Sequence, residues 1–131
     1  MNVLVLGSGG REHALSHKIV QSTKCEKLFI APGNGGTAAL GENVSLDIES
    51  AAEVAAFVKA HAVDIVVIGP EAPLVAGVHD GLKSFPELEN LVVVGPRQAA
   101  AELEGSKDFA KEFMMRHNIP TAAYQTFTKD T

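Results

Sequence analysis

The residues best suited to bind an anion lie near the N-terminus, where a short apolar run ends in glycines. The run Val3 to Leu6 leads through Gly7 and Ser8 into the group Gly9, Gly10, Arg11 and Glu12. Backbone N–H groups at the start of a helix lack intrahelical acceptors and carry partial positive charge, so they attract anions. Arg11 adds a charged fork suited to phosphate oxygens. The pattern predicts a phosphate site at this strand–glycine–helix junction.

A second candidate is a glycine-rich loop that follows the expected strand at 27–31. It contains Pro32, Gly33, Asn34, Gly35, Gly36 and Thr37. Three glycines give more backbone freedom than a simple connection needs, which is typical of a ligand loop, although a flexible turn without contacts has the same composition. Glu71, just after Gly69 and Pro70, could accept hydrogen bonds from sugar hydroxyls or an amine; a solvated loop acid is its alternative.

Two histidines and one cysteine are weaker candidates for functional residues. His13 and His17 have the spacing of helical metal ligands, but no glutamate lies between them, so a packing His13 beside an exposed His17 is the simpler interpretation and no metal site is predicted. Cys25 is the single cysteine and has no disulfide partner within the chain. We therefore expect a reducing compartment, the cytoplasm.

The first glycines also suggest a dinucleotide fold, but the match is incomplete. Glu12 stands where the third glycine of that fingerprint is expected. No acidic residue for a ribose hydroxyl follows the second strand, where the sequence reads Ala31 to Asn34. An NAD-dependent oxidoreductase is thereby disfavoured. Glycines that serve only helix–strand packing remain an alternative.

Composition limits the partners. The chain has 131 residues, of which 46% are hydrophobic, enough to form the core of one globular domain. Its formal net charge of -5 argues against binding to nucleic acid or to an anionic membrane. No apolar run is long enough to cross a bilayer. Small molecules are the expected ligands.

Apolar β-branched runs alternate with helix-period stretches, which predicts an α/β fold: an open parallel sheet of about five strands with helices on both faces. The expected strands are 2–6, 27–31, 43–46, 64–68 and 91–94, and the expected helices are 11–21, 50–60, 74–84, 97–103 and 107–117. Ser50 and Ser106 are the expected N-caps of two of these helices. The expected strand 64–68 is continuously apolar after Asp64 and should lie in the middle of the sheet, covered on both faces.

The end of the chain has its own pattern. Residues 124–128 alternate as a strand would, and the sequence then stops without a closing element, so we expect it to end within a domain. Ligands of open parallel sheets bind beyond the carboxyl ends of the strands. The segments Gly7 to Glu12, Pro32 to Thr37 and Gly69 to Pro73 should therefore line one crevice.

Four segments together resemble the phosphoribosylamine–glycine ligase family: residues 7–15, 31–37, 69–77 and 104–122. The segments 78–81 and 85–90 are less typical of it. The resemblance implies a Rossmann-like pre-ATP-grasp domain at 1–104, followed at 105–131 by a linker and the start of a truncated ATP-grasp domain. It also implies an ATP-dependent ligase of purine biosynthesis that joins glycine to 5-phosphoribosylamine.

The same resemblance assigns ligands. ATP, glycine, 5-phosphoribosylamine and Mg²⁺ or Mn²⁺ are the expected ligands of the full-length enzyme, which is expected to be monomeric. Lys107 corresponds to an early ATP-binding lysine, while the catalytic and metal-binding residues are expected beyond Thr131. No cofactor is expected to bind tightly to residues 1–131, and this portion alone is expected to be inactive. A ribose-phosphate or nucleotide-binding module without catalysis is the alternative.

Overall fold

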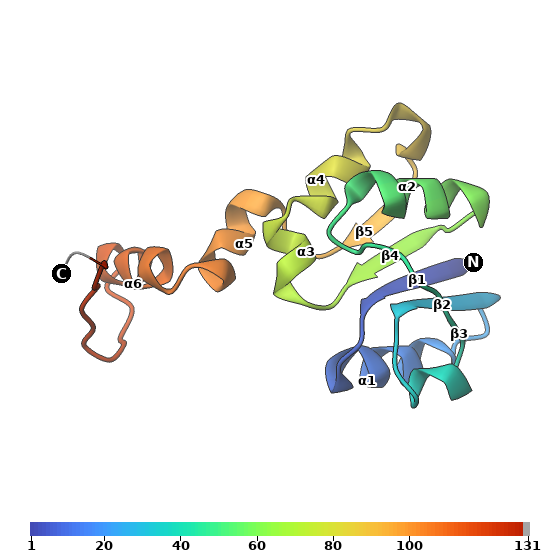
Figure 1. Ribbon diagram of the computed structural model, residues 1–131, viewed down its shortest axis with the longest axis horizontal. Helices are drawn as coiled ribbons and strands as arrows, with labels where there is room; N and C mark the ends of the chain where they lie inside the picture. The colour runs from blue at the N-terminus through green and yellow to red at the C-terminus, as the bar shows by residue number, and fades with distance from the viewer. Residues whose placement is uncertain (130–131) are drawn as a thin grey trace.

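The fold is a five-stranded parallel sheet, seen in a computed structural model that describes residues 1–129 (Figure 1). The strand order is β3-β2-β1-β4-β5. The strands are β1 (Asn2–Gly7), β2 (Lys27–Pro32), β3 (Glu42–Asn43), β4 (Ile65–Ile68) and β5 (Val92–Val94). The predicted fold class is confirmed, and the weak third strand is only two residues long.

In the described part of the chain, six α-helices connect or follow the strands: α1 (Gly10–Ile19), α2 (Ala51–Ala60), α3 (Glu71–Val75), α4 (Val78–Lys83), α5 (Gln98–Gly105) and α6 (Lys107–Arg116). Short 3₁₀ turns occupy Thr37–Ala39 and Pro86–Leu88. Both predicted serine caps are confirmed, since Ser50 Oγ accepts from Glu53 N at 3.3 Å and Ser106 Oγ from Phe109 N at 3.2 Å. Within residues 1–129 no helix has the length and apolarity needed to cross a membrane.

β1 is the central strand and the most buried one. It pairs with β2 on one side and with β4 on the other, so that Leu6 lies between Ala31 and Ile68. Leu4 and Leu6 point to one face of the sheet, where they join a core formed with α2, α3 and α4. Val3 and Val5 point to the other face, which α1 covers through Ile19. Helices therefore lie on both faces, as predicted.

The prediction that residues 64–68 form a middle strand covered on both faces is wrong. β4 is second from the sheet edge, and only Val66 and Ile68 are buried. Ile65 and Val67 are half-buried, and on the edge strand Val92 and Val94 are 52% and 49% exposed. The reason is that α1 packs mainly on β1 and β2. We call the surface formed by Ile65, Val67, Val92 and Val94 the open sheet face.

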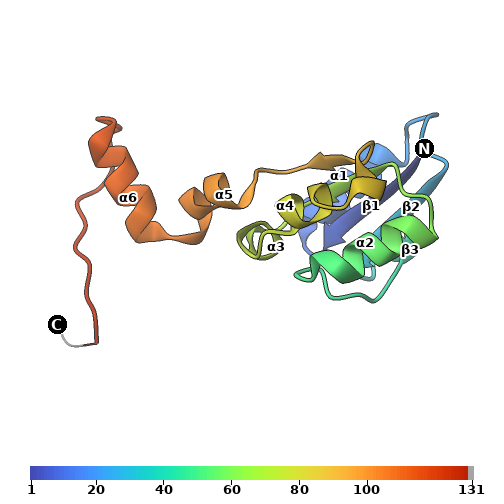
Figure 2. The same ribbon diagram turned by 90° about the horizontal axis from the view of Figure 1, so that it is seen from above.

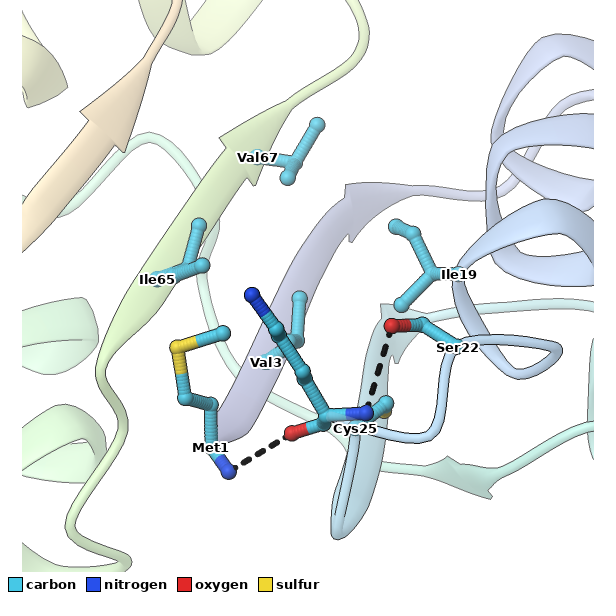
Figure 3. Close-up of a pocket in the computed structure, with 8 residues that line it drawn as sticks. Met1, Val3, Ile19, Ser22, Cys25, Ile65 and Val67 are labelled. Carbon is cyan, nitrogen blue, oxygen red and sulfur yellow. Dashed lines mark hydrogen bonds between the residues drawn. The ribbon is translucent and has the colours of Figure 1, made fainter.

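A hollow of about 230 Å³ lies against this open sheet face. Figure 3 shows side chains that line it. Ile65 and Val67 line it from β4, and Val3 lines it from β1. Met1 and Ile19 close its other sides, so its walls are mainly apolar. The hollow lies on a face of the sheet and contains none of the predicted site residues.

The single helix predicted at 74–84 is wrong, because the segment forms two helices, α3 and α4. Gly77, the residue before α4, has φ +85°, a left-handed conformation that ends α3 and redirects the chain. Gln98 Nε2 donates to the Val75 carbonyl at 2.9 Å and so satisfies an acceptor at the end of α3. The break therefore ties α3 to α5, and Asp80 of α4 adds to this by accepting from Gln98 N at 2.9 Å.

Helices α5 and α6 form an arm that leads away from the sheet (Figure 2). Ala101 is buried against the main core, whereas α6 has no buried residue within its described range. The strand predicted at 124–128 is wrong: among the described residues no strand follows β5. Alternation alone was insufficient, because a strand needs a neighbour to pair with. The segment instead returns along α6, where Thr126 Oγ1 donates to the Asp108 carboxylate.

We expect Gly81→Ala to lower the free energy of unfolding by about 1 kcal/mol. A Cβ at Gly81 would overlap the Cβ of Ala51, where α4 packs on α2. Overpacking costs about 1–3 kcal/mol, which outweighs the gain of about 1 kcal/mol from replacing glycine in a helix. Urea unfolding measures the change. The swap Ala51→Gly with Gly81→Ala should recover most of the loss, and a stabilised single variant would contradict the packing argument.

Candidate functional site

The turns after β1, β4 and β5 meet at the carboxyl edge of the sheet and enclose a cavity of about 230 Å³. Its lining residues are Arg11, Gly69, Glu71, Leu74, Pro96 and Glu104. Arg11 comes from the first turn of α1, and Glu71 begins α3. The parallel arrangement brings them together because the carboxyl ends of all strands lie at one edge.

Glu12 lies beneath this cavity rather than in it. Only 3% of the residue is exposed, although it is a charged residue. Its Oε2 accepts from Gly9 N at 2.7 Å, and its Oε1 accepts from Arg11 Nε at 2.9 Å. A buried carboxylate needs such partners to offset the loss of water. The contacts make Glu12 an internal partner of the glycine turn.

Arg11 is the cation of the site. Its side chain is 59% exposed, and its pKa is raised above the usual value, chiefly by the hydrogen bond to Glu12. Desolvation opposes this rise, and the charges of Glu12, Glu71 and Glu104 add smaller upward contributions. Because Nε binds Glu12, the four hydrogens of the two terminal nitrogens are left for other partners. Arg11 therefore carries its positive charge at neutral pH.

The glycines next to Glu12 are required by its side chain. A Cβ at Gly7 would lie 2.6 Å from Glu12 Cγ, and Gly7 has φ +123°, which side chains rarely adopt. A Cβ at Gly69 would overlap the Glu12 carboxylate. Glu12 thus stands at the position of the third glycine of a dinucleotide fingerprint, where a small residue is needed for close packing of helix on strand. This packing is further evidence against NAD binding.

The loop after β2 is hydrogen-bonded to the glycine turn after β1, but it does not line the cavity. Gly33 N donates to the Gly7 carbonyl at 3.1 Å, and Asn34 Nδ2 donates to the Ser8 carbonyl at 2.8 Å. Asn34 Oδ1 accepts from Gly36 N and Thr37 N at 2.8 and 3.0 Å. The amide of Asn34 therefore has internal partners on both sides, and Thr37 is fully buried.

Two glycines of this loop, Gly35 and Gly36, are exposed. A Cβ at Gly35 would meet nothing within 4 Å, so the backbone there faces open space. Gly36 lies against His13, whose Nε2 would be 3.1 Å from a Cβ at that position. His13 is half-buried and His17 exposed.

The structure therefore divides the predicted site into parts. Arg11 and Glu71 line the same cavity, and Glu12 supports it from below. The loop after β2 lies on the other side of the glycine turn after β1; it comprises Pro32, Gly33, Asn34, Gly35, Gly36 and Thr37. Lys107 begins α6 in the arm and is not among the lining residues. Within residues 1–129 no group of three His, Cys, Asp or Glu side chains is placed to hold a metal ion.

Three lining residues were missed from the sequence: Leu74, Pro96 and Glu104. Pro96 follows β5 as Pro70 follows β4, so the repeated Gly–Pro at the two strand ends was the available signal. Glu104 had no comparable signal. It reaches the cavity only because α5 packs on α3.

Comparison with known proteins gives consistent matches. The family profile described as phosphoribosylglycinamide synthetase, N domain, matches residues 1–104. The phosphoribosylamine–glycine ligases of Mesorhizobium japonicum and Vibrio parahaemolyticus are 56% and 52% identical over 97% and 98% of this chain. The chain spans only 29% and 30% of their lengths. The crystal structure of the Thermotoga maritima phosphoribosylamine–glycine ligase matches with a TM-score of 0.63 and 32% identity, over 94% of this chain and 26% of that protein.

Proposed function

The chain belongs to the N-domain family of phosphoribosylglycinamide synthetase, and on that premise we propose that it holds 5-phosphoribosylamine for a phosphoribosylamine–glycine ligase. The observation that carries the proposal is the cavity at the carboxyl edge of the sheet, with one guanidinium and two carboxylates on its wall. These groups match a substrate that bears a phosphate, hydroxyls and an amine.

Each group of the substrate has a suitable partner at this edge. The phosphate would bind the Arg11 guanidinium and the amides of Gly10 and Arg11, which precede the first intrahelical bond, from His13 N to the Gly9 carbonyl. Glu71 would accept hydrogen bonds from ribose hydroxyls or the amine. The exposed backbone at Gly35 and Gly36 would approach the sugar from the other side.

The proposed reaction has two steps. ATP transfers its γ-phosphoryl group to the carboxylate of glycine, which releases ADP. The amine of 5-phosphoribosylamine then attacks the acyl phosphate at carbon and expels phosphate, so that an amide bond forms in glycinamide ribonucleotide. The role of this chain would be to hold the amine so that it meets the activated carbonyl in the correct orientation.

We assign ATP, glycine and Mg²⁺ or Mn²⁺ mainly to the part of the ligase relatives that this chain does not match. Lys107 is the residue of this chain proposed to contact ATP. We further propose that residues 1–104 are the substrate-binding domain and that 105–131 lead into the ATP-grasp part. The cytoplasm is the proposed location and the monomer the proposed state of the full-length enzyme.

The test is to express residues 1–131 alone beside a full-length ligase from a relative. Calorimetry with glycinamide ribonucleotide should show binding to both proteins. An assay of ADP release with phosphoribosylamine, glycine and ATP should show turnover by the full-length control and none by residues 1–131. Positioning of ATP phosphates by metal and charge supplies most of the rate of phosphoryl transfer, and we assign that machinery outside this chain.

The assay also separates the alternatives. Binding of ribose 5-phosphate as tight as that of glycinamide ribonucleotide would favour a general ribose-phosphate module. A fluorescence change of NADH on addition of the chain would favour the oxidoreductase. Glycine-dependent turnover by residues 1–131, equal to that of the control, would contradict the division of labour proposed above.

A further inference from the structure

The cation of the cavity is surrounded by carboxylates, of which only one is bonded to it. Arg11 Nε donates to Glu12 at 2.9 Å, while Glu71 and Glu104 line the same cavity as Arg11. No hydrogen bond or ion pair joins Arg11 to Glu71 or Glu104 within the described residues. Arg11 is therefore held at the base of the cavity although two other carboxylates lie near it.

The bond to Glu12 is the strongest of these interactions because Glu12 is buried. A side chain with 4% exposure is poorly screened by water, whereas Glu71 and Glu104 are exposed and solvated. Glu12 is also fixed by the Gly9 amide and by the close approach of Gly7 and Gly69. Its carboxylate cannot follow Arg11 into the cavity, so it anchors the guanidinium from below.

We propose that Glu12 is a positioning residue: it holds Arg11 away from Glu71 and Glu104, so that all three groups stay available to the substrate. This inference rests on the proposed function, and it changes the role of Glu12 from the substrate contact that the sequence predicted. Without the Glu12 carboxylate, Arg11 would pair with Glu71 or Glu104. An internal ion pair would then occupy the groups that recognise phosphate and hydroxyls.

The test is a double-mutant cycle with Glu12→Gln and Arg11→Ala, measured as the Kd for glycinamide ribonucleotide. The first substitution places a neutral amide beside Arg11 in place of the carboxylate. We expect Glu12→Gln to raise Kd about tenfold, the change carried by one charge-assisted hydrogen bond of modest strength. In the Arg11→Ala background the same change should alter Kd less than about twofold, because Glu12 acts through Arg11. If the fold-increases in Kd of the two single variants multiply in the double variant, the proposal is overturned.

Two further variants support this cycle, one as a control and one as a substitute for Glu12→Gln. Glu87→Gln removes a carboxylate of the same charge that pairs with Lys59 at 3.7 Å outside the cavity, and it should leave Kd unchanged. If Glu12→Gln does not fold, Gly69→Ala replaces it. The new methyl group would displace the Glu12 carboxylate without changing the charge, and Gly69 does not have the positive φ that would forbid alanine. Gly69→Ala should then show the same dependence on Arg11.

A measurement without ligand separates this inference from the proposed function. The ¹H–¹⁵N signal of Arg11 Nε should show protection from solvent exchange in the original protein. Arg97 is the internal reference, because its Nε lies 3.8 Å from Asp80 Oδ1, beyond hydrogen-bond distance. Glu12→Gln should make the Arg11 signal exchange as fast as that of Arg97. An unchanged Arg11 signal overturns the positioning role, whereas a protein that binds no glycinamide ribonucleotide contradicts only the proposed function.

Discussion

Replacing Leu6 by alanine is expected to lower the free energy of unfolding by about 2–5 kcal/mol, the range for truncating a fully buried leucine. Leu6 has no exposed surface, lies on the central strand and packs in the core shared with α2, α3 and α4. Neighbouring strands on both sides prevent collapse of the cavity that alanine would leave. Because domains are stable by only about 5–15 kcal/mol, the change removes a large share of the total.

Urea unfolding followed by circular dichroism measures this loss. The matched control is Leu103→Ala, which removes the same atoms from a leucine that is 40% exposed on α5. That control should cost less than about 1 kcal/mol. Equal losses for the two variants would show that the core is not centred on β1.

Replacing Arg11 by alanine is expected to weaken the binding of glycinamide ribonucleotide by about 1–3 kcal/mol, which is about a 5- to 150-fold rise in Kd. Among the described residues that line the cavity, the guanidinium is the one cation, so its loss leaves two carboxylates facing the phosphate. Calorimetry gives the affinity directly.

Arg97→Ala is the matched control for this prediction. Arg97 also follows a strand at the carboxyl edge, and its side chain is 71% exposed, but it does not line the cavity. Its removal should change Kd less than about twofold. An unchanged Kd for Arg11→Ala would remove Arg11 from the binding site and leave the turn amides as the remaining candidate for the phosphate.

Short sequence patterns were sufficient to predict the elements whose ends are set by neighbouring residues. The apolar run before Gly7 predicted β1 and the start of α1 to within one residue, because glycine and the helix start act on their own neighbours. Ser50 predicted the start of α2 for the same reason, since its hydroxyl caps an amide three residues away. Arg11 and Glu71 could be assigned to one crevice because parallel strands end at one edge.

Features that depend on contacts between residues far apart in the sequence could not be predicted from short patterns. The burial of Glu12 depends on Gly69, which is far away in sequence but adjacent across the pair of β1 and β4. Residues 65–68 are all apolar, yet their coverage depends on how far α1 extends over the sheet. The sequence predicts one helix in place of α3 and α4 because a single glycine such as Gly77 is tolerated within a helical pattern. Its left-handed conformation is fixed with α5, through the bond from Gln98 to Val75.

The open sheet face has a thermodynamic consequence. The heat capacity of unfolding arises mainly from apolar surface that becomes hydrated when the chain unfolds. Val92 and Val94 are already about half hydrated in the folded protein, and α6 adds a helix without a buried residue in its described range. These segments contribute little new apolar hydration, so the heat capacity increment per residue should fall below the usual range of about 12–15 cal/mol/K. The stability curve of this chain is correspondingly shallow, with stability that changes slowly as temperature moves away from its optimum.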